Sequence, residues 1–153
     1  MSKITVFDVA KYILEKQGEM TAMKLQKLVY YSKAWSLVWD EDELFSEEIQ
    51  AWANGAVVPD LFFKHKGVFK VAADFFNEGD SSHLSINQKD TIDKVLDFYG
   101  NYSAQQLSDI NHQEDPWKEA RGDLPPMAKC TAIITSGSIF EYYSGISPNV
   151  QSE

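Results

Sequence analysis

Residues 21–39 form the stretch TAMKLQKLVYYSKAWSLVW, and this stretch decides the fold. Apolar side chains recur along it every three or four residues, at Leu25, Leu28, Val29, Trp35 and Trp39. Further apolar residues extend this surface around the cylinder: Met23, Tyr30, Ala34 and Leu37. A helix that is apolar on so much of its circumference is usually central in a domain. The stretch therefore predicts one buried helix, around which the other elements pack.

The neighbouring segments predict the elements on either side of this helix. An amphipathic helix is expected at residues 6–17, with Thr5 at its capping position and Gly18 placed to end it. After the central helix, residues 45–58 predict a short β-hairpin, because Asn54-Gly55 is a turn signal followed by β-branched residues.

A series of shorter helices is expected in the rest of the chain. Pro59 suits the first turn of a helix that Gly67 would end, and residues 69–82 predict a loop with short pieces of structure. The tetrapeptides SINQ at 85–88 and SAQQ at 103–106 are capping boxes, and each predicts the start of a helix.

The end of the chain predicts two more short helices and a tail. Asp115 is expected to cap a helix that has Pro116 at its first position. A last helix is expected at 138–143 with three residues facing inward: Ile139, Phe140 and Tyr143. We expect one domain over residues 1–145, a compact, mainly α helical bundle with a minor β-hairpin, and a flexible tail over 146–153.

Composition limits the classes of function. The 153 residues include 14 basic and 23 acidic ones, so the net charge is −9, and a field of that sign repels nucleic acid. The single cysteine, Cys130, fits a reducing compartment. The start of the chain does not resemble a signal peptide, and no apolar run approaches membrane-spanning length. These features predict a cytoplasmic protein with no membrane partner.

One cluster, His112 with Glu114 and Asp115, invites a catalytic or metal-binding interpretation. Two alternatives compete with it, because Asp115 can cap the following helix and His112 can end the previous one favourably. No phosphate loop or nucleophile elbow is present, and no two histidines have the spacing of a helical zinc site. We therefore expect no catalytic residue, metal or cofactor, with a small hydrolase or a metal-dependent enzyme that uses this cluster as the alternative.

Three segments resemble the Panacea, or SocA-like, antitoxin domain. The first is MKLQKLVYY at 23–31, similar to the family's K-L-Q-K-L-[LV]-Y-Y-[AS]. The second is EIQAWANGAVVP at 48–59, similar to I-x-A-W-x-x-G-P-V-V-P. The third, from LS at 107–108 to EDPWKEAR at 114–121, resembles L-S-x-x-[ST]-H-x-E-x-P-W-x-x-A-R. The matching residues are Lys24, Leu25, Gln26, Lys27, Leu28, Tyr30, Tyr31, Trp52, Gly55, Pro59, His112, Pro116, Trp117 and Arg121.

The resemblance implies an activity. Members of this family, often found in prophages and mobile elements, bind and neutralise protein toxins encoded beside them, and some deliver the toxin to a protease such as an AAA+ protease. The family has no cofactor or catalytic residue. One departure is Ala56, where the family usually has proline, and we expect a looser turn there. An alternative to the antitoxin is a regulator of its own operon, although the net charge disfavours operator binding.

The second segment and the residues after it offer a docking surface. A toxin with a basic face would be attracted by the charge of −9. If the hairpin protrudes, the protein-binding residues are Trp52, Gly55, Val57, Pro59, Phe62 and Phe63. The other interpretation is that these residues close one end of the helical core. Tryptophan fits either role, since it is common both in interiors and at interface hot spots. The sequence predicts no particular oligomeric state.

Overall fold

The computed structural model describes residues 4–151, with side chains up to residue 146. Within these residues the chain is mainly helical, as predicted. The helices are α1 (Val6–Gln17), α2 (Ala22–Trp39), α3 (Pro59–His65), α4 (Ile86–Tyr99), α5 (Ala104–His112), α6 (Asp115–Arg121) and α7 (Ser136–Gln151). The strands are β1 (Met20–Thr21), β2 (Ile49–Trp52), β3 (Gly55–Val57), β4 (Lys70–Val71) and β5 (Ile133–Ile134). Two 3₁₀ turns, η1 (Ala73–Phe75) and η2 (Ser81–His83), lie before α4.

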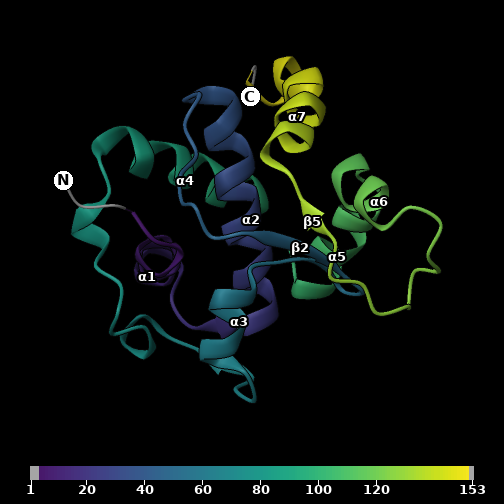
Figure 1. Ribbon diagram of the computed structural model, residues 1–153. Coiled ribbons are helices and arrows are strands. Elements are labelled where there is room, and N and C mark those ends of the chain that lie inside the picture. Colours follow the sequence, from purple (N-terminus) through teal and green to yellow (C-terminus); the bar gives the residue numbers. More distant parts are fainter. Residues whose placement is uncertain (1–3, 152–153) are drawn as a thin grey trace.

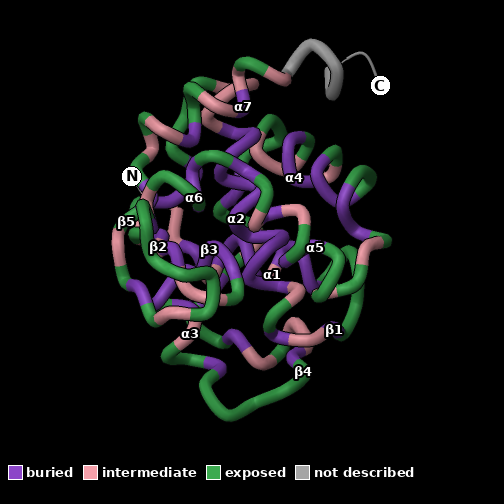
Figure 2. The backbone as a smooth tube through the Cα atoms, turned by 90° about the vertical axis from the view of Figure 1, so that its right-hand side faces the viewer, coloured by how far each residue is buried: buried purple, intermediate pink, exposed green. Residues whose placement is uncertain are grey.

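Helix α2 runs through the middle of the molecule, as its apolar circumference predicted. Helices α1, α4, α5 and α7 and the strand β3 all pack against it (Figure 1). Leu25, Val29 and Trp35 are fully buried, and most of this helix is buried along its length (Figure 2). The side chain of Thr21 accepts a hydrogen bond from the backbone N–H of Lys24 at 3.1 Å and so caps its start.

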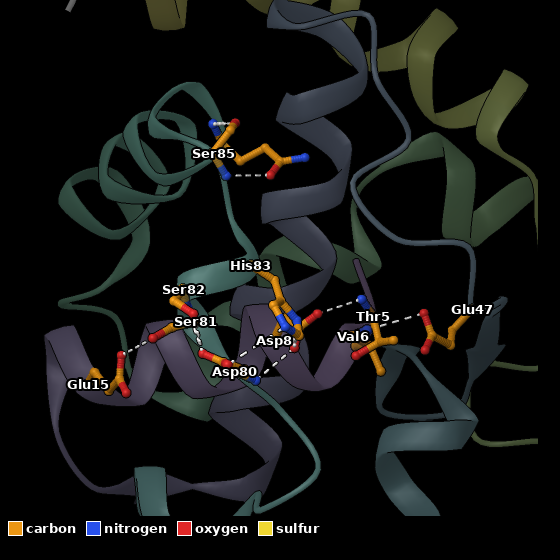
Figure 3. A network of polar contacts seen from close by, with 11 residues as sticks. Thr5, Val6, Asp8, Glu15, Glu47, Asp80, Ser81, Ser82, His83 and Ser85 are labelled. Atoms are coloured by element: carbon orange, nitrogen blue, oxygen red, sulfur yellow. Dashed lines mark hydrogen bonds and ion pairs between the residues drawn. The ribbon is translucent and has the colours of Figure 1, made fainter. Parts of the chain in front are cut away.

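A buried carboxylate attaches α1 to the segment that precedes α4 (Figure 3). Asp8, only 2% exposed, accepts hydrogen bonds from the backbone N–H groups of Thr5 at 2.9 Å and Asp80 at 2.7 Å. The ring of His83 lies 3.4 Å from the same carboxylate. These bonds satisfy a charge that would otherwise be costly to bury, and they fix residues far apart in sequence.

The predicted hairpin forms the centre of a small sheet. β2 pairs antiparallel with β3, with Ala51 opposite Ala56, and its other edge pairs with β5, where Ile49 lies opposite Ile134. A second sheet pairs β1 with β4. The strands β1, β4 and β5 were not predicted, because each has two residues and is defined by its partner rather than by a local pattern.

Two predictions about the C-terminal helices were wrong. The N-cap of α6 is Glu114 and not Asp115, because the backbone carbonyl of Glu114 accepts the first helical bond, from Lys118 N at 3.2 Å. In α7 the residues Ile139 and Tyr143, four positions apart, are fully buried, but Phe140 is 43% exposed because it lies about 100° around the helix from Ile139, at the edge of the buried face.

Helix α7 is also longer than predicted. It begins at Ser136 and runs to Gln151, so it includes most of the segment expected to be a flexible tail. Whether the chain beyond 145 is mobile stays a prediction, and residues 152–153 lie outside the described part of the chain. None of the helices in the described residues combines the length and the apolarity that crossing a membrane would require.

The single arginine of the chain, Arg121, holds the loop after α6 against the sheet. Its guanidinium group is 5% exposed and donates to the carbonyl oxygens of Ala51, Pro125, Pro126 and Ala128 at 2.7–3.1 Å. Its charged head also lies 4.9 Å from the ring centre of Trp117. A planar fork of donors is suited to several carbonyl groups at once, and lysine cannot replace it.

We predict that Arg121→Met lowers the free energy of unfolding by about 3 kcal/mol, because it leaves buried carbonyl groups without donors. Urea unfolding measures the change. Lys118→Met, one turn earlier on the same helix, removes only an exposed ion pair with Asp115 and should change stability by less than about 0.5 kcal/mol. Equal effects of the two substitutions would show that Arg121 is not a structural support.

Candidate docking site

The motif residues of the sequence meet around the β2–β3 hairpin. The indole N–H of Trp117 donates to the carbonyl of Trp52 at 2.8 Å, and His112 stacks on Trp117 with ring centres 4.3 Å apart. Arg121 donates to Ala51 in the same strand at 3.0 Å. The third segment therefore supports the second, and both lie against α2.

Gln26 on α2 fixes the chain where the hairpin passes into α3. Its side-chain oxygen accepts from the backbone N–H of Val58 at 2.9 Å, and its amide nitrogen donates to the carbonyl of Val58 at 3.3 Å. The amide nitrogen also lies 3.0 Å from Nε2 of His65. Burial lowers the pKa of His65 and so favours the neutral imidazole, whose Nε2 can accept this bond in the tautomer protonated at Nδ1. The buried amide of Gln26 is thus fully used.

Gly55 is required by both its backbone and its neighbours. Its φ of +118° lies in a region that side chains disfavour. A Cβ atom at this position would lie 2.7 Å from Cε of Lys27 and 2.8 Å from Oδ1 of Asn111. The hairpin turn therefore lies directly on two side chains from helices α2 and α5.

The expected loosening at Ala56 does not occur. The backbone N–H of Ala56 donates to Oδ1 of Asn111 at 2.7 Å, and both residues are fully buried. Proline has no such N–H. The pattern of the resembling family has Ser or Thr where this chain has Asn111, so the two departures from the pattern bond to each other. The amide of Asn111 and the N–H of Ala56 together hold the turn.

A cluster of tyrosines surrounds the carboxylate of Glu114. The hydroxyl groups of Tyr31 and Tyr143 each donate to Oε1 of Glu114 at 2.7 Å, and the amide of Asn111 donates to it at 3.3 Å. Burial raises the pKa of Glu114, and the three hydrogen bonds oppose that shift. The hydroxyl of Tyr30 joins the cluster through Tyr143 at 3.2 Å. This arrangement ties α7 to α2 and to the start of α6.

The geometry gives no support to a hydrolase built from His112, Glu114 and Asp115. Glu114 faces the tyrosines, Asp115 pairs with Lys118 at 3.7 Å, and His112 lies on Trp117. No hydrogen bond joins any two of the three within the described residues. The same part of the chain contains no group of three or more potential metal ligands.

A cavity of about 550 Å³ opens between the start of α2, the hairpin, α3 and the loop after α3. Its volume lies within the range of ligand pockets in proteins. The lining is predominantly apolar and includes Trp52, Val57, Phe62 and Phe69. Trp52 and Phe62 contact each other edge to face, with ring centres 4.9 Å apart, and form one wall.

The polar feature of this cavity is the side chain of Lys27. It is 1% exposed and lines the cavity beneath Gly55. Within residues 4–146, whose side chains are described, its ammonium group has neither a hydrogen-bond partner nor an acidic group within ion-pair distance. Burial lowers its pKa to about 8, so the amine is still mostly charged at neutral pH. The positive charge in turn lowers the pKa of His112 and His65, although burial is the larger cause for both.

Exposed apolar side chains line the cavity or contact its wall, and we call them the apolar rim: Met23, Phe63, Val68 and Phe69. Phe63 and Phe69 are 68% and 75% exposed. Phe63 contacts Phe62 with ring centres 5.9 Å apart, and the other three line the cavity itself. Grouped exposed apolar residues around a hollow are typical of binding sites, whereas single ones are common on any protein.

A comparison with protein families places the chain among known antitoxin domains. A family model described as "Antitoxin SocA-like, Panacea domain" matches residues 25–118, more than half of the chain.

The chain belongs to this family.

No curated protein and no solved structure shows a significant match to it. The match begins at Leu25 and ends at Lys118, so it includes α2 from Leu25 onward, the hairpin, α3 and α5. These elements build most of the cavity of this Panacea domain, and Thr21, Ala22 and Met23, which precede the match, complete its lining.

The structure separates the six residues predicted to bind a partner. Gly55, Val57 and Pro59 are buried, so they support the hairpin, although Val57 also reaches the cavity. Trp52 and Phe62 are half-buried in the cavity wall. Phe63 is exposed on the rim. The interpretation as core therefore fits Gly55, Val57 and Pro59, and partner binding by the less buried residues stays a prediction.

Sequence reasoning missed the rest of the site. Lys27 was recognised as a motif residue, but its helical position gave no sign that it lacks a partner. Val68 and Phe69 fell in or beside a stretch predicted to be a loop. One sequence feature could have indicated this part of the site: two large apolar residues lie between Lys66 and Lys70, in a segment with little to bury them.

We predict that Lys27→Met stabilises this Panacea domain by about 2 kcal/mol at pH 7, because it removes a buried charge and keeps the apolar stem. The pKa of Lys27 is about 8 when folded, against the ordinary lysine value of 10.5 that applies to the unfolded chain. Between these two values the unfolded chain binds more protons, so rising pH stabilises the wild type. The advantage of the variant should therefore be full below about pH 8 and vanish near pH 10.5.

Urea unfolding of wild type and variant from pH 7 to pH 10.5 measures this difference. The matched control is Lys129→Met, because Lys129 is exposed and lies outside the cavity. It should change stability little, at any pH. A Lys27→Met protein that is less stable than the wild type would mean that the ammonium group is satisfied in the free protein.

Proposed function

We propose that this chain is an antitoxin that neutralises a protein toxin by contact alone, and that the toxin docks on the apolar rim and in the cavity behind it. The position of the apolar rim next to the cavity supports this proposal. Phe69, which is 75% exposed, lines a cavity built largely by the elements of the family match, and Phe63, which is 68% exposed, contacts the cavity-lining Phe62. Large aromatic anchors beside a pocket are typical of binding hot spots.

The charge distribution supports a protein partner. The net charge of −9 favours fast association with a partner that has a basic face. A second hollow between α6 and α7 is lined by Asp115, Glu119 and Glu141. It lies near the opposite end of α2 from α3 and the cavity (Figure 1). Acidic surface can thus attract the partner while the apolar rim makes the close contact.

Blocking is the mechanism that the rim favours. An antitoxin that covers its toxin needs one surface, whereas an adaptor that delivers the toxin to an AAA+ protease needs a second surface for the protease. Co-expression in a host without that protease separates the two mechanisms. Neutralisation that persists there supports blocking, and neutralisation that is lost there supports delivery.

We predict that the double substitution Phe63→Ser, Phe69→Ser abolishes neutralisation without unfolding the protein. The loss of two exposed anchors should weaken toxin binding at least about 30-fold, since one hot spot contributes 2 kcal/mol or more. The melting temperature should change little because both side chains are exposed. Growth rescue and co-purification on co-expression with the product of the adjacent gene measure the effect.

The control is Ile86→Ser, because Ile86 is 79% exposed and does not line the cavity. It removes a comparable exposed apolar side chain and should leave neutralisation intact. If the double variant still rescues growth as well as the wild type does, the toxin docks elsewhere and the proposal is wrong.

A further inference from the structure

Most of the buried polar side chains of α2 have hydrogen-bond partners. Gln26 bonds to Val58, Ser32 to the carbonyl of Leu28 at 2.8 Å, and Ser36 to the carbonyl of Asp42 at 3.1 Å. Lys33 pairs with Glu43 at 3.3 Å. Lys27 is as buried as these residues, but it has no such partner within the described part of the chain. A buried charged donor that has no partner strongly attracts an acceptor that enters the cavity.

The cavity around Lys27 has no acidic lining, although the protein as a whole is acidic. Although the chain has 23 acidic residues, none is among the described residues that line the cavity. The loop that forms the outer wall, residues 67–69, lies between two exposed lysines, Lys66 and Lys70. The cavity therefore favours an anion at its floor and an apolar body along its walls.

We propose that the cavity binds a carboxylate carried on an apolar segment of a partner protein, and that the ammonium group of Lys27 forms an ion pair with it. This inference rests on the proposed function and adds the chemistry that the partner must present. The carboxylate is that of an aspartate or glutamate side chain, or of the end of the partner chain, with apolar residues beside it.

A carboxylate fits the floor better than a phosphate group does. Lys27 is one positive charge, and it balances one negative charge, whereas a phosphate group carries nearly two and needs several donors. The side-chain amide of Gln26 is already engaged with Val58 and His65, and the indole N–H of Trp52 donates to Gln50 at 2.8 Å. The ammonium group is thus the main donor available at the floor.

A polypeptide segment fits the entrance better than a free small molecule does. A small carboxylate that fills the cavity would leave Phe63 and the outer part of Phe69 in water. An extended peptide can insert one acidic side chain and lay its neighbours on the apolar rim. Covering the rim contributes favourable free energy that a free carboxylate cannot gain.

The pairing also explains how this contact gives specificity. In the free protein Lys27 costs stability, because burial disfavours its charged form and no acidic group within the described residues pairs with it. A partner with a carboxylate removes that penalty, whereas a partner of the same shape with a neutral amide leaves the charge unpaired. Specificity of this kind comes from the penalty against the wrong ligand rather than from added contact area.

The test uses three probes: acetyl-Phe-Asp-Leu-amide, acetyl-Phe-Asn-Leu-amide and 3-phenylpropionate. NMR of the lysine side chains follows binding, and Lys27 is assigned as the signal missing from Lys27→Met. We expect the Asp peptide to shift the Lys27 signal and to bind at least about 10-fold more tightly than the Asn peptide, which is one charge-assisted contact. We expect Lys27→Met to bind both peptides equally and Lys129→Met to behave as the wild type.

Three results would overturn the inference. One is equal affinity of the wild type for the Asp and Asn peptides, and another is a preference for Asp that survives in Lys27→Met. The third is the absence of any shift of the Lys27 signal with millimolar probe. Tighter binding of 3-phenylpropionate than of the Asp peptide would exclude a polypeptide as the source of the carboxylate.

Co-expression with the product of the adjacent gene separates this inference from the proposed function. We expect Lys27→Met to lose growth rescue although it is folded and stable. If Lys27→Met rescues growth while the Phe63→Ser, Phe69→Ser protein does not, the toxin docks on the rim and the carboxylate contact is wrong. If both variants rescue growth, the docking face itself is wrong.

Discussion

The structure depends on one constraint, which is that α2 is buried on nearly all sides although several of its side chains are polar. Burying a polar group without a partner is costly, so most of these side chains have a partner, and several of the partners belong to the surrounding elements. Gln26 requires the backbone of Val58, and this contact fixes the end of the hairpin. Tyr31 requires the carboxylate of Glu114, and this contact fixes the start of α6. The polar contacts of α2 therefore fix the positions of the hairpin and of the C-terminal helices.

The same constraint distinguishes the residues that support the hairpin from the residues that are available to a partner. Gly55, Asn111, Trp117 and Arg121 hold the hairpin in place, and none of them is exposed. The apolar rim has no comparable structural task, because its side chains contact solvent and the cavity. Lys27 belongs to both groups, since it lies under the hairpin and also faces the cavity. We expect partner preference to depend on the rim and on Lys27, while the motif residues serve to keep the cavity in shape.

The sequence predicted the elements whose signals are local. The apolar circumference of residues 21–39, the capping boxes at 85–88 and 103–106, and the Asn54-Gly55 turn each corresponded to an element. It could not predict β5, because the two residues Ile133 and Ile134 form a strand only by pairing with β2. The sequence also placed the N-cap of α6 one residue too late, because the hydrogen bonds from the tyrosines to Glu114 join residues that are distant in sequence.

For the candidate site the sequence predicted less. It identified Trp52, Phe62 and Phe63 as docking residues, and these stand in or beside the cavity. It did not identify the loop wall at 67–69, because a loop gives no periodic pattern. Nor did it assign a role to Lys27, because whether a buried charge has a partner depends on residues distant in sequence. The family match gives the antitoxin class but not the contact surface.

Backbone amide hydrogen exchange shows directly whether the toxin docks on the cavity face. The measurement compares the free chain with the complex that co-purifies with the product of the adjacent gene. We expect slower exchange in the complex at the start of α2, in α3 and in the loop at 67–69, with little change in α4 and α7. Protection confined to α6 and α7, with unchanged exchange at 59–69, would contradict it.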